Sequence, residues 1–183
     1  MRTLFAGALV FAVALPVGIQ HSALMINYSD SVPLGLYRRV PASAAAYAGF
    51  CLPSTTATAA LRAGLYVVPG ACTGGLAPVL KPFIYPSPKQ PLIYDARGFS
   101  FKGKLLPNTA PKAHSRTGIA LVHYAFGTYK NGIWAVSDFN ANSYDSRYFG
   151  PLAPDAIRFY AKPLLTWLQK ETNTHEIGHQ TAR

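Results

Sequence analysis

The chain has 183 residues, half of them hydrophobic and only 13% charged, which excludes a disordered protein and is enough for one domain with a buried core. The formal net charge is +10, but the basic residues are scattered and no known nucleic-acid-binding motif accompanies them, so we expect no nucleic-acid partner. Only seven residues are acidic, which argues against a two-carboxylate glycosidase or a carboxylate-rich Mg²⁺ site.

The N-terminus carries an apolar run without charge, residues 4–19, preceded only by Arg2. This run is short for a bilayer span, which needs about 20 residues, but its extension to Ile26 reaches that length. A cleaved signal peptide is the alternative. The region after Val17 lacks an A-x-A pattern, which favours an uncleaved membrane anchor over residues 1–26. In both cases the charge distribution places the body of the protein outside the cytoplasm.

Residues 29–37 read Ser-Asp-Ser-Val-Pro-Leu-Gly-Leu-Tyr. Pro33 pushes Val32 toward an extended conformation and removes a backbone donor, while Gly35 permits close approach of another segment. We expect a rigid corner that can hold a serine hydroxyl out of a sheet. A plain surface turn is the alternative, because Ser, Asp and Pro are common turn residues.

Cys51 and Cys72 are the two cysteines of the chain. In a protein that lies outside the cytoplasm, such a pair is best interpreted as one disulfide. Neither cysteine has an obvious partner base for catalysis or nearby ligands for zinc.

Short apolar and β-branched segments separated by Gly and Pro predict a mainly β domain over residues 27–170, followed by a polar tail over 171–183. The expected strands are Leu65–Val68, Val79–Tyr85, Leu92–Tyr94, a hairpin over Phe99–Leu106 that turns at Lys102-Gly103, Ile119–Tyr124 and Ile133–Val136. Residues 156–161 predict a strand or a short helix that ends at Pro163, and residues 164–169 predict one or two helical turns.

Lys81 lies in an otherwise apolar segment, residues 76–85. A lysine in such a segment usually reaches to solvent through its long side chain. The alternative is an amine held in an apolar pocket, where burial lowers its pKa and allows it to act as a general base.

Asp145 and Arg147 are two residues apart, so on a strand their side chains would share a face and form an ion pair. A structural pair that closes a loop is the simplest interpretation of these two residues alone.

Three segments behind the apolar run carry a resemblance: residues 29–37, Leu80-Lys81, and residues 143–151, which read Ser-Tyr-Asp-Ser-Arg-Tyr-Phe-Gly-Pro. In this order they resemble the TraF-type conjugative-transfer signal peptidases, relatives of the bacterial type I signal peptidases. The resemblance extends from the N-terminal run to about Trp167. It implies a type I signal-peptidase-like antiparallel β-sheet domain behind an N-terminal hydrophobic helix.

The resemblance also implies a Ser–Lys dyad. Ser31 matches the nucleophile and Lys81 the general base. Ser29 matches a second serine whose hydroxyl joins the backbone N–H of Ser31 in the oxyanion hole.

Three further residues match the last segment of the family pattern. Ser143 matches the serine that orients the lysine amine. Asp145 matches an aspartate that the family needs, either as a catalytic residue or to hold the site together, and Arg147 matches its ion-pair partner. Relatives usually carry a Pro-Gly-Asp turn after the base lysine, and residues 85–91 replace it here. This difference brings in Lys89 as an alternative base, although Lys89 lacks the apolar surroundings of Lys81.

The function implied by the resemblance is that of a serine endopeptidase anchored in the bacterial inner membrane, with its catalytic domain in the periplasm. It would cleave a precursor protein, and a conjugative pilin is the expected substrate. The acyl-enzyme would then be resolved either by hydrolysis or by cyclisation of the product. Its partners would be this precursor and the membrane lipid, and it would need no cofactor.

Two alternatives remain from the sequence. His175, Glu176 and His179 fit the H-E-x-x-H signature of zinc peptidases, but Gly178 weakens a helix and four residues follow, so we expect a polar tail and no metal. The second alternative is a non-catalytic, β-rich assembly factor of the secretion apparatus that has kept the fold.

Overall fold

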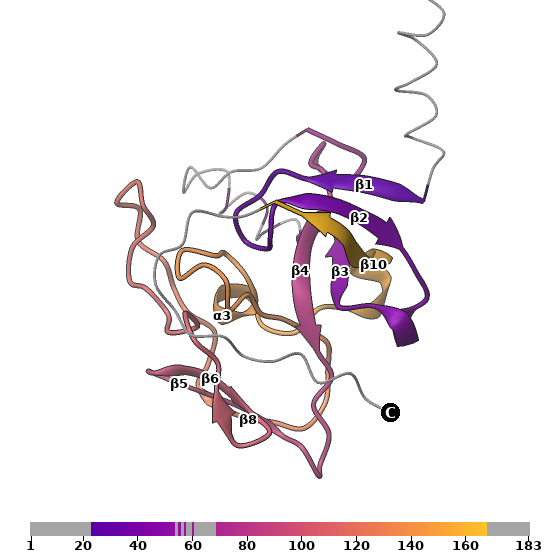
Figure 1. Ribbon diagram of the computed structural model, residues 1–183. Helices are drawn as coiled ribbons and strands as arrows, with labels where there is room; N and C mark the ends of the chain where they lie inside the picture. Colours follow the sequence, from indigo (N-terminus) through magenta and orange to yellow (C-terminus); the bar gives the residue numbers. More distant parts are fainter. Residues whose placement is uncertain (1–22, 54, 56, 58–59, 61–68, 168–183) are drawn as a thin grey trace, which may run out of the picture.

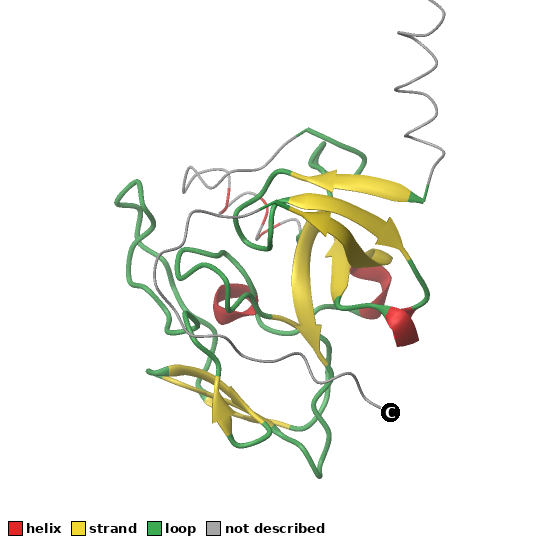
Figure 2. Cartoon of the chain, in the orientation of Figure 1, coloured by secondary structure: helices red, strands yellow, loops and turns green. Residues whose placement is uncertain are grey.

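The computed structural model describes residues 23–53, 55, 57, 60 and 69–167. Two antiparallel sheets make up the described chain (Figures 1 and 2). The first sheet has six strands in the order β1-β2-β10-β3-β4-β9, and the second has four in the order β7-β6-β5-β8. The prediction of a mainly β protein is confirmed.

The strands of the first sheet are β1 (Leu24–Asn27), β2 (Gly35–Arg39), β3 (Tyr47–Phe50), β4 (Val79–Ile84), β9 (Trp134–Ala135) and β10 (Ile157–Thr166). The strands of the second sheet are β5 (Leu92–Asp95), β6 (Gly98–Phe101), β7 (Lys104–Leu105) and β8 (Gly127–Tyr129). The short helical elements are η1 (Ala42–Ala44), α3 (Ser146–Phe149) and η2 (Pro154–Ala156).

Several predicted strands are present close to their expected positions, namely β4, β5, the β6–β7 hairpin, β9 and the first half of β10. The hairpin turns at Lys102 and Gly103, which both have positive φ (52° and 74°). Two successive residues in this region give the turn that matches the twist of the flanking strands.

Two predicted elements are wrong. Residues 119–124 form no strand. Their backbone bonds to the preceding loop, as in Leu121 N–H to the Ala113 carbonyl (2.8 Å), and to α3, as in Tyr124 N–H to the Arg147 carbonyl (2.7 Å). Pro163 does not end the last strand: β10 continues to Thr166, with an irregularity between Pro163 and Leu165, and pairs with β2. The helical turn expected from Leu164 onward is therefore wrong for residues 164–166, which belong to the strand.

The N-terminal prediction is corrected at its end. Leu24–Ile26, assigned to the hydrophobic segment, lie in β1 and pair with β2. Residues 1–22, the expected strand Leu65–Val68 and the tail motif from His175 lie outside the described residues. Within the described part, no helix has the length and apolar character needed to cross a bilayer.

Strand β9 packs against residues of both sheets. Trp134 belongs to a buried cluster with Leu92, Tyr94 and Phe99 of the second sheet, whereas Ala135 belongs to a cluster with Phe50 of the first. Successive residues of a strand point to opposite faces, so this short strand is buried on both sides. The segment that follows β9 is therefore held firmly, which matters for the site described below.

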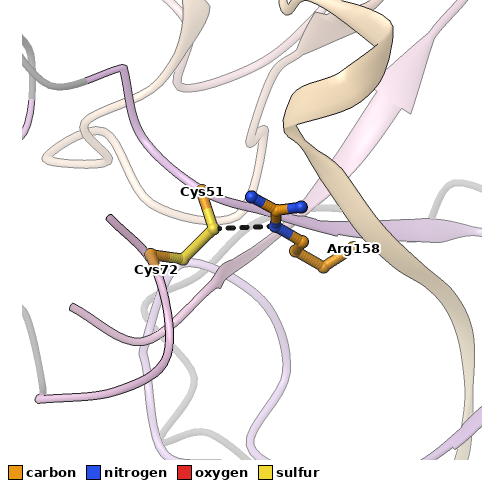
Figure 3. Close-up of a disulfide and its surroundings, with 3 residues drawn as sticks. All are labelled: Cys51, Cys72 and Arg158. Atoms are coloured by element: carbon orange, nitrogen blue, oxygen red, sulfur yellow. Dashed lines mark hydrogen bonds between the residues drawn. A yellow bond between two sulfur atoms is a disulfide. The ribbon is translucent and has the colours of Figure 1, made fainter. Parts of the chain in front are cut away.

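Cys51 and Cys72 form the expected disulfide, which lies beside β10 (Figure 3). The Arg158 Nε donates a hydrogen bond to the Cys51 Sγ (3.2 Å). The disulfide joins the end of β3 to the segment that leads into β4, the strand that carries Lys81.

Replacing both cysteines with serine is expected to lower the free energy of unfolding by about 3 kcal/mol, because the crosslink limits the freedom of the unfolded chain. Urea unfolding of the two proteins, with and without a reducing agent, measures this effect. The reducing agent should shift the midpoint of the wild type and leave that of the double variant unchanged. Equal midpoints for both proteins under oxidising conditions would contradict the prediction.

Candidate active site

The corner that carries the two serines is held by Asn27, the last residue of β1. The Asn27 Nδ2 donates to the carbonyls of Ser29 (2.8 Å), Val32 (3.2 Å) and Pro33 (3.1 Å), and its Oδ1 accepts from the Ser29 N–H (3.1 Å). The Tyr37 hydroxyl donates to the same Pro33 carbonyl (2.6 Å). Hydrogen bonds from the Asn27 and Tyr37 side chains, and not strand pairing, therefore hold the backbone of this corner.

Ser31 lies in this corner and is 7% exposed. Its hydroxyl takes part in none of the hydrogen bonds between described residues, and no buried side-chain nitrogen or oxygen among them lacks a partner. The Ser31 hydroxyl therefore keeps a small accessible area within a residue that is otherwise buried. The Ser31 N–H donates to the Ser29 Oγ (3.3 Å), so the two groups expected to form an oxyanion hole are neighbours.

Lys81 lies in the middle of β4, opposite Ala48 of β3, and is 4% exposed. Its Nζ donates to the Ser143 Oγ (2.7 Å). Burial lowers the pKa of Lys81 to about 8, and the Asp145 carboxylate opposes this shift without cancelling it. The alternative base, Lys89, lies exposed in a loop, in contrast to the buried Lys81.

Asp145 and Arg147 form an ion pair that is fully buried. The Arg147 Nε and Nη2 donate to the two carboxylate oxygens of Asp145, each at 2.8 Å. The pairing was expected, but the local structure differs: Asp145 caps the N-terminus of α3, where it accepts from the Arg147 N–H (3.1 Å). Arg147 also donates to the Asn108 carbonyl (2.8 Å), which ties the loop after β7 to the site.

Ser137, two residues after β9, connects these parts of the site. Its Oγ donates to the Ser31 carbonyl, and its N–H donates to the Asp145 Oδ2 (3.0 Å). Val32 and Leu80, the neighbours of Ser31 and Lys81, pack in the same buried cluster. The structure thus brings the serine corner, the lysine strand and the buried ion pair together.

One expected contact is not made in the described chain. The Lys81 amine is hydrogen-bonded to Ser143, and no hydrogen bond joins it to the Ser31 hydroxyl. Two residues that the sequence did not indicate, Asn27 and Ser137, hold the corner in place. An asparagine that precedes a turn is a weak signal for the first, and no sequence pattern signals the second.

The described residues contain no group of three or more His, Cys, Asp and Glu side chains that could hold a metal ion. The H-E-x-x-H segment lies outside them, so its assignment as a polar tail stays a prediction.

No protein-family model and no solved structure matches the chain. Curated proteins do match it over most of its length. It is 29% identical over 175 residues to a plasmid transfer protein TraF from Escherichia coli, covering 91% of this chain and 98% of the relative. A second Escherichia coli plasmid transfer protein TraF is 31% identical over 147 residues, with 78% and 82% covered.

The conjugal transfer protein TraF of Agrobacterium tumefaciens (strain 15955) is 30% identical over 166 residues, which cover 88% of this chain and 93% of the relative. The chain belongs to the TraF family of conjugal transfer proteins.

Proposed function

We propose that this protein is a membrane-anchored serine endopeptidase of a conjugative transfer system, with Ser31 as nucleophile and Lys81 as general base. Membership of the TraF family supports the role in conjugative transfer. The observation that carries the peptidase assignment is a buried lysine, 4% exposed and with its pKa lowered to about 8, on a strand whose Leu80 packs with Val32 of the serine corner.

In the proposed reaction, the neutral Lys81 amine takes the proton of the Ser31 hydroxyl as the oxygen attacks the scissile carbonyl. The lysine then gives this proton to the leaving amine, and an ester remains on Ser31. Water, or an amine of the substrate, resolves this ester. The Ser143 hydroxyl holds the Lys81 amine by the 2.7 Å contact. The missing contact to Ser31 would form as substrate binds, because catalytic hydrogen bonds often tighten only in the complex.

The oxyanion of the tetrahedral intermediate would bind at the Ser31 N–H and the Ser29 hydroxyl. In the free protein the N–H donates to this hydroxyl at 3.3 Å, a long and weak bond. The oxyanion would replace the Ser29 oxygen as acceptor for the N–H, and the hydroxyl would turn to donate. Such donors stabilise the transition state by about 3 kcal/mol each.

An apolar row on the first sheet supports a location at the membrane. Ile26, Leu36 and Leu165 are register partners across β1, β2 and β10, so their side chains share one face. Tyr28 is 77% exposed and Trp167 46%, and aromatic residues of this kind favour the interface of a bilayer. We propose that this face lies against the periplasmic surface of the inner membrane, where an exported pilin-like precursor would meet Ser31.

The test is the labelling of the full-length protein in detergent by a serine-directed acylating probe, followed by mass spectrometry. We expect the label on Ser31 and its loss in the Ser31→Ala variant. In cells, the same variant should stop maturation of the precursor and lower plasmid transfer by several orders of magnitude, while the protein stays folded by circular dichroism.

Ser100→Ala, a serine of β6 remote from the corner in sequence, is the matched control and should retain labelling and maturation. If the Ser31→Ala variant still matured the precursor, the peptidase assignment would be wrong. Plasmid transfer that depends on the protein but not on Ser31 would then favour the non-catalytic assembly factor.

A further inference from the structure

We infer that Ser137 is a positioning residue that sets the orientation of Ser31 relative to Lys81. This inference rests on the proposed function of these two residues. Ser137 is fully buried, and its hydroxyl and its backbone N–H both form hydrogen bonds within the site. Its hydroxyl donates to the Ser31 carbonyl, while its backbone N–H donates to the Asp145 carboxylate (3.0 Å).

The hydrogen bond from Ser137 to the Ser31 carbonyl holds a part of the corner that Asn27 does not hold. Asn27 holds the carbonyls of Ser29, Val32 and Pro33, but not that of Ser31. The peptide group after Ser31 therefore depends on Ser137 for its orientation. Because Val32 on the far side of this peptide is anchored in the buried cluster, a change of the Ser31 ψ angle would move the rest of Ser31, with its hydroxyl and its N–H, relative to the sheet.

Ser137 is itself fixed to the strand that carries the base. The Val136 N–H donates to the carbonyl of Pro82, the residue after Lys81 (3.0 Å), and Ala135 pairs with Phe83 of β4. On the other side, Asp145 is locked by Arg147. Because the Lys81 amine and the Ser31 hydroxyl share no hydrogen bond in the free protein, this chain of contacts keeps the nucleophile in register with the base.

The test compares Ser137→Ala with Ser146→Ala in the full-length protein. Ser146 is also fully buried and also makes one side-chain bond to the backbone, accepting from the Ala135 N–H (2.9 Å), but among the described residues no hydrogen bond joins it to Ser31. Each variant loses one buried hydroxyl, so a general loss of stability should be similar in both. The measurement is the rate constant for acylation of Ser31 at saturating probe, and its dependence on pH.

For Ser137→Ala we expect the maximal acylation rate constant to fall by about 10- to 100-fold, the effect of a small misplacement of a reacting group. The probe concentration at half-saturation and the pH at which the rate levels off should not change, because the contact between Lys81 and Ser143 is untouched. Ser146→Ala should acylate within about threefold of the wild type. Wild-type acylation by Ser137→Ala, or an equal loss in both variants, would overturn the inference.

A second measurement separates this inference from the proposed function. Amide hydrogen exchange over residues 29–32 should be about tenfold faster in Ser137→Ala and unchanged in Ser146→Ala, whether or not Ser31 reacts. If the wild type is not acylated but the exchange result holds, the peptidase assignment fails while the positioning contact stands. If the exchange rates of the two variants are the same, the positioning inference fails, even where Ser31 is acylated.

Discussion

Replacing Lys81 with methionine is expected to give a protein that is inactive and yet more stable than the wild type. Lys81 is 4% exposed, and its pKa falls from 10.5 to about 8 because the charged amine loses its contact with water. At neutral pH the folded protein must bury this charge or release its proton, and both are unfavourable. Methionine has a similar length, fills the same space and carries no charge.

The lowered pKa gives the size of this effect. A shift of this extent corresponds to about 3 kcal/mol of stability lost at neutral pH. The variant also loses the bond from Lys81 to Ser143, worth about 1 kcal/mol. We therefore expect a net gain of about 2 kcal/mol for Lys81→Met, which raises the melting temperature by several degrees in a chain of this size.

The lowered pKa of Lys81 also determines how the stability of the wild type changes with pH. Between pH 8 and 10.5 the unfolded chain holds the lysine proton and the folded chain has lost it, so the stability of the wild type rises with pH through this window. Below pH 8 both states are protonated and the penalty is constant. The advantage of Lys81→Met should thus be largest below pH 8 and become small above pH 10.5.

The rate of Ser31 acylation should also depend on the protonation state of the Lys81 amine. Acylation of Ser31 by the wild type should rise about tenfold for each pH unit below 8 and level off above it, because only the neutral amine accepts a proton. Thermal unfolding and acylation measured from pH 6 to 10.5 test both expectations. Lys89→Met, which replaces an exposed lysine of the same type, is the control and should change neither quantity. A lower melting temperature for Lys81→Met at pH 7 would contradict the unfavourable free energy assigned to burying the amine.

The parts of the fold that the sequence predicted are those fixed by local chemistry. The turn at Lys102-Gly103 follows from residues that accept positive φ, and β4 and β5 follow from short apolar segments between prolines. The disulfide follows from the number of cysteines and the expected compartment. The burial of Lys81 is only the alternative in the sequence: the apolar residues around it favour a side chain that reaches solvent, whereas the structure holds the residue at 4% exposure.

The parts that could not be predicted depend on contacts between distant segments. Pro163 is compatible with a strand because an irregularity in the pairing with β2 accommodates it there, and that partner is more than one hundred residues away. Ser137 and Asn27 are ordinary polar residues in sequence. Their role arises only when β9 and β1 bring them to the serine corner.

The buried ion pair gives the largest expected loss of stability. Replacing Arg147 with methionine leaves the Asp145 carboxylate fully buried, and its hydrogen-bond partners among the described residues are then the backbone N–H groups of Ser137 and of position 147. Breaking a buried pair from one side typically costs about 3–5 kcal/mol, because the remaining charge is not compensated. We expect Arg147→Met to lower the free energy of unfolding by this amount and to free the loop at Asn108, which Arg147 holds.

A double-mutant cycle tests whether this loss comes from the unpaired charge. Asp145→Asn keeps an oxygen that can cap α3 but removes the charge, so the double variant Asp145→Asn/Arg147→Met should be more stable than Arg147→Met alone. The matched control is Arg97→Met. Arg97 pairs with Asp95 at the same spacing and a similar distance (2.9 Å), but this pair is exposed.

Urea unfolding should show little change for Arg97→Met, because water screens an exposed pair. Equal losses for Arg97→Met and Arg147→Met would contradict the argument. Since Asp145 accepts from the N–H of Ser137, and Ser137 holds Ser31, the folded fraction of Arg147→Met should also acylate more slowly than the wild type. The ion pair would then support the nucleophile through position alone, without taking part in proton transfer.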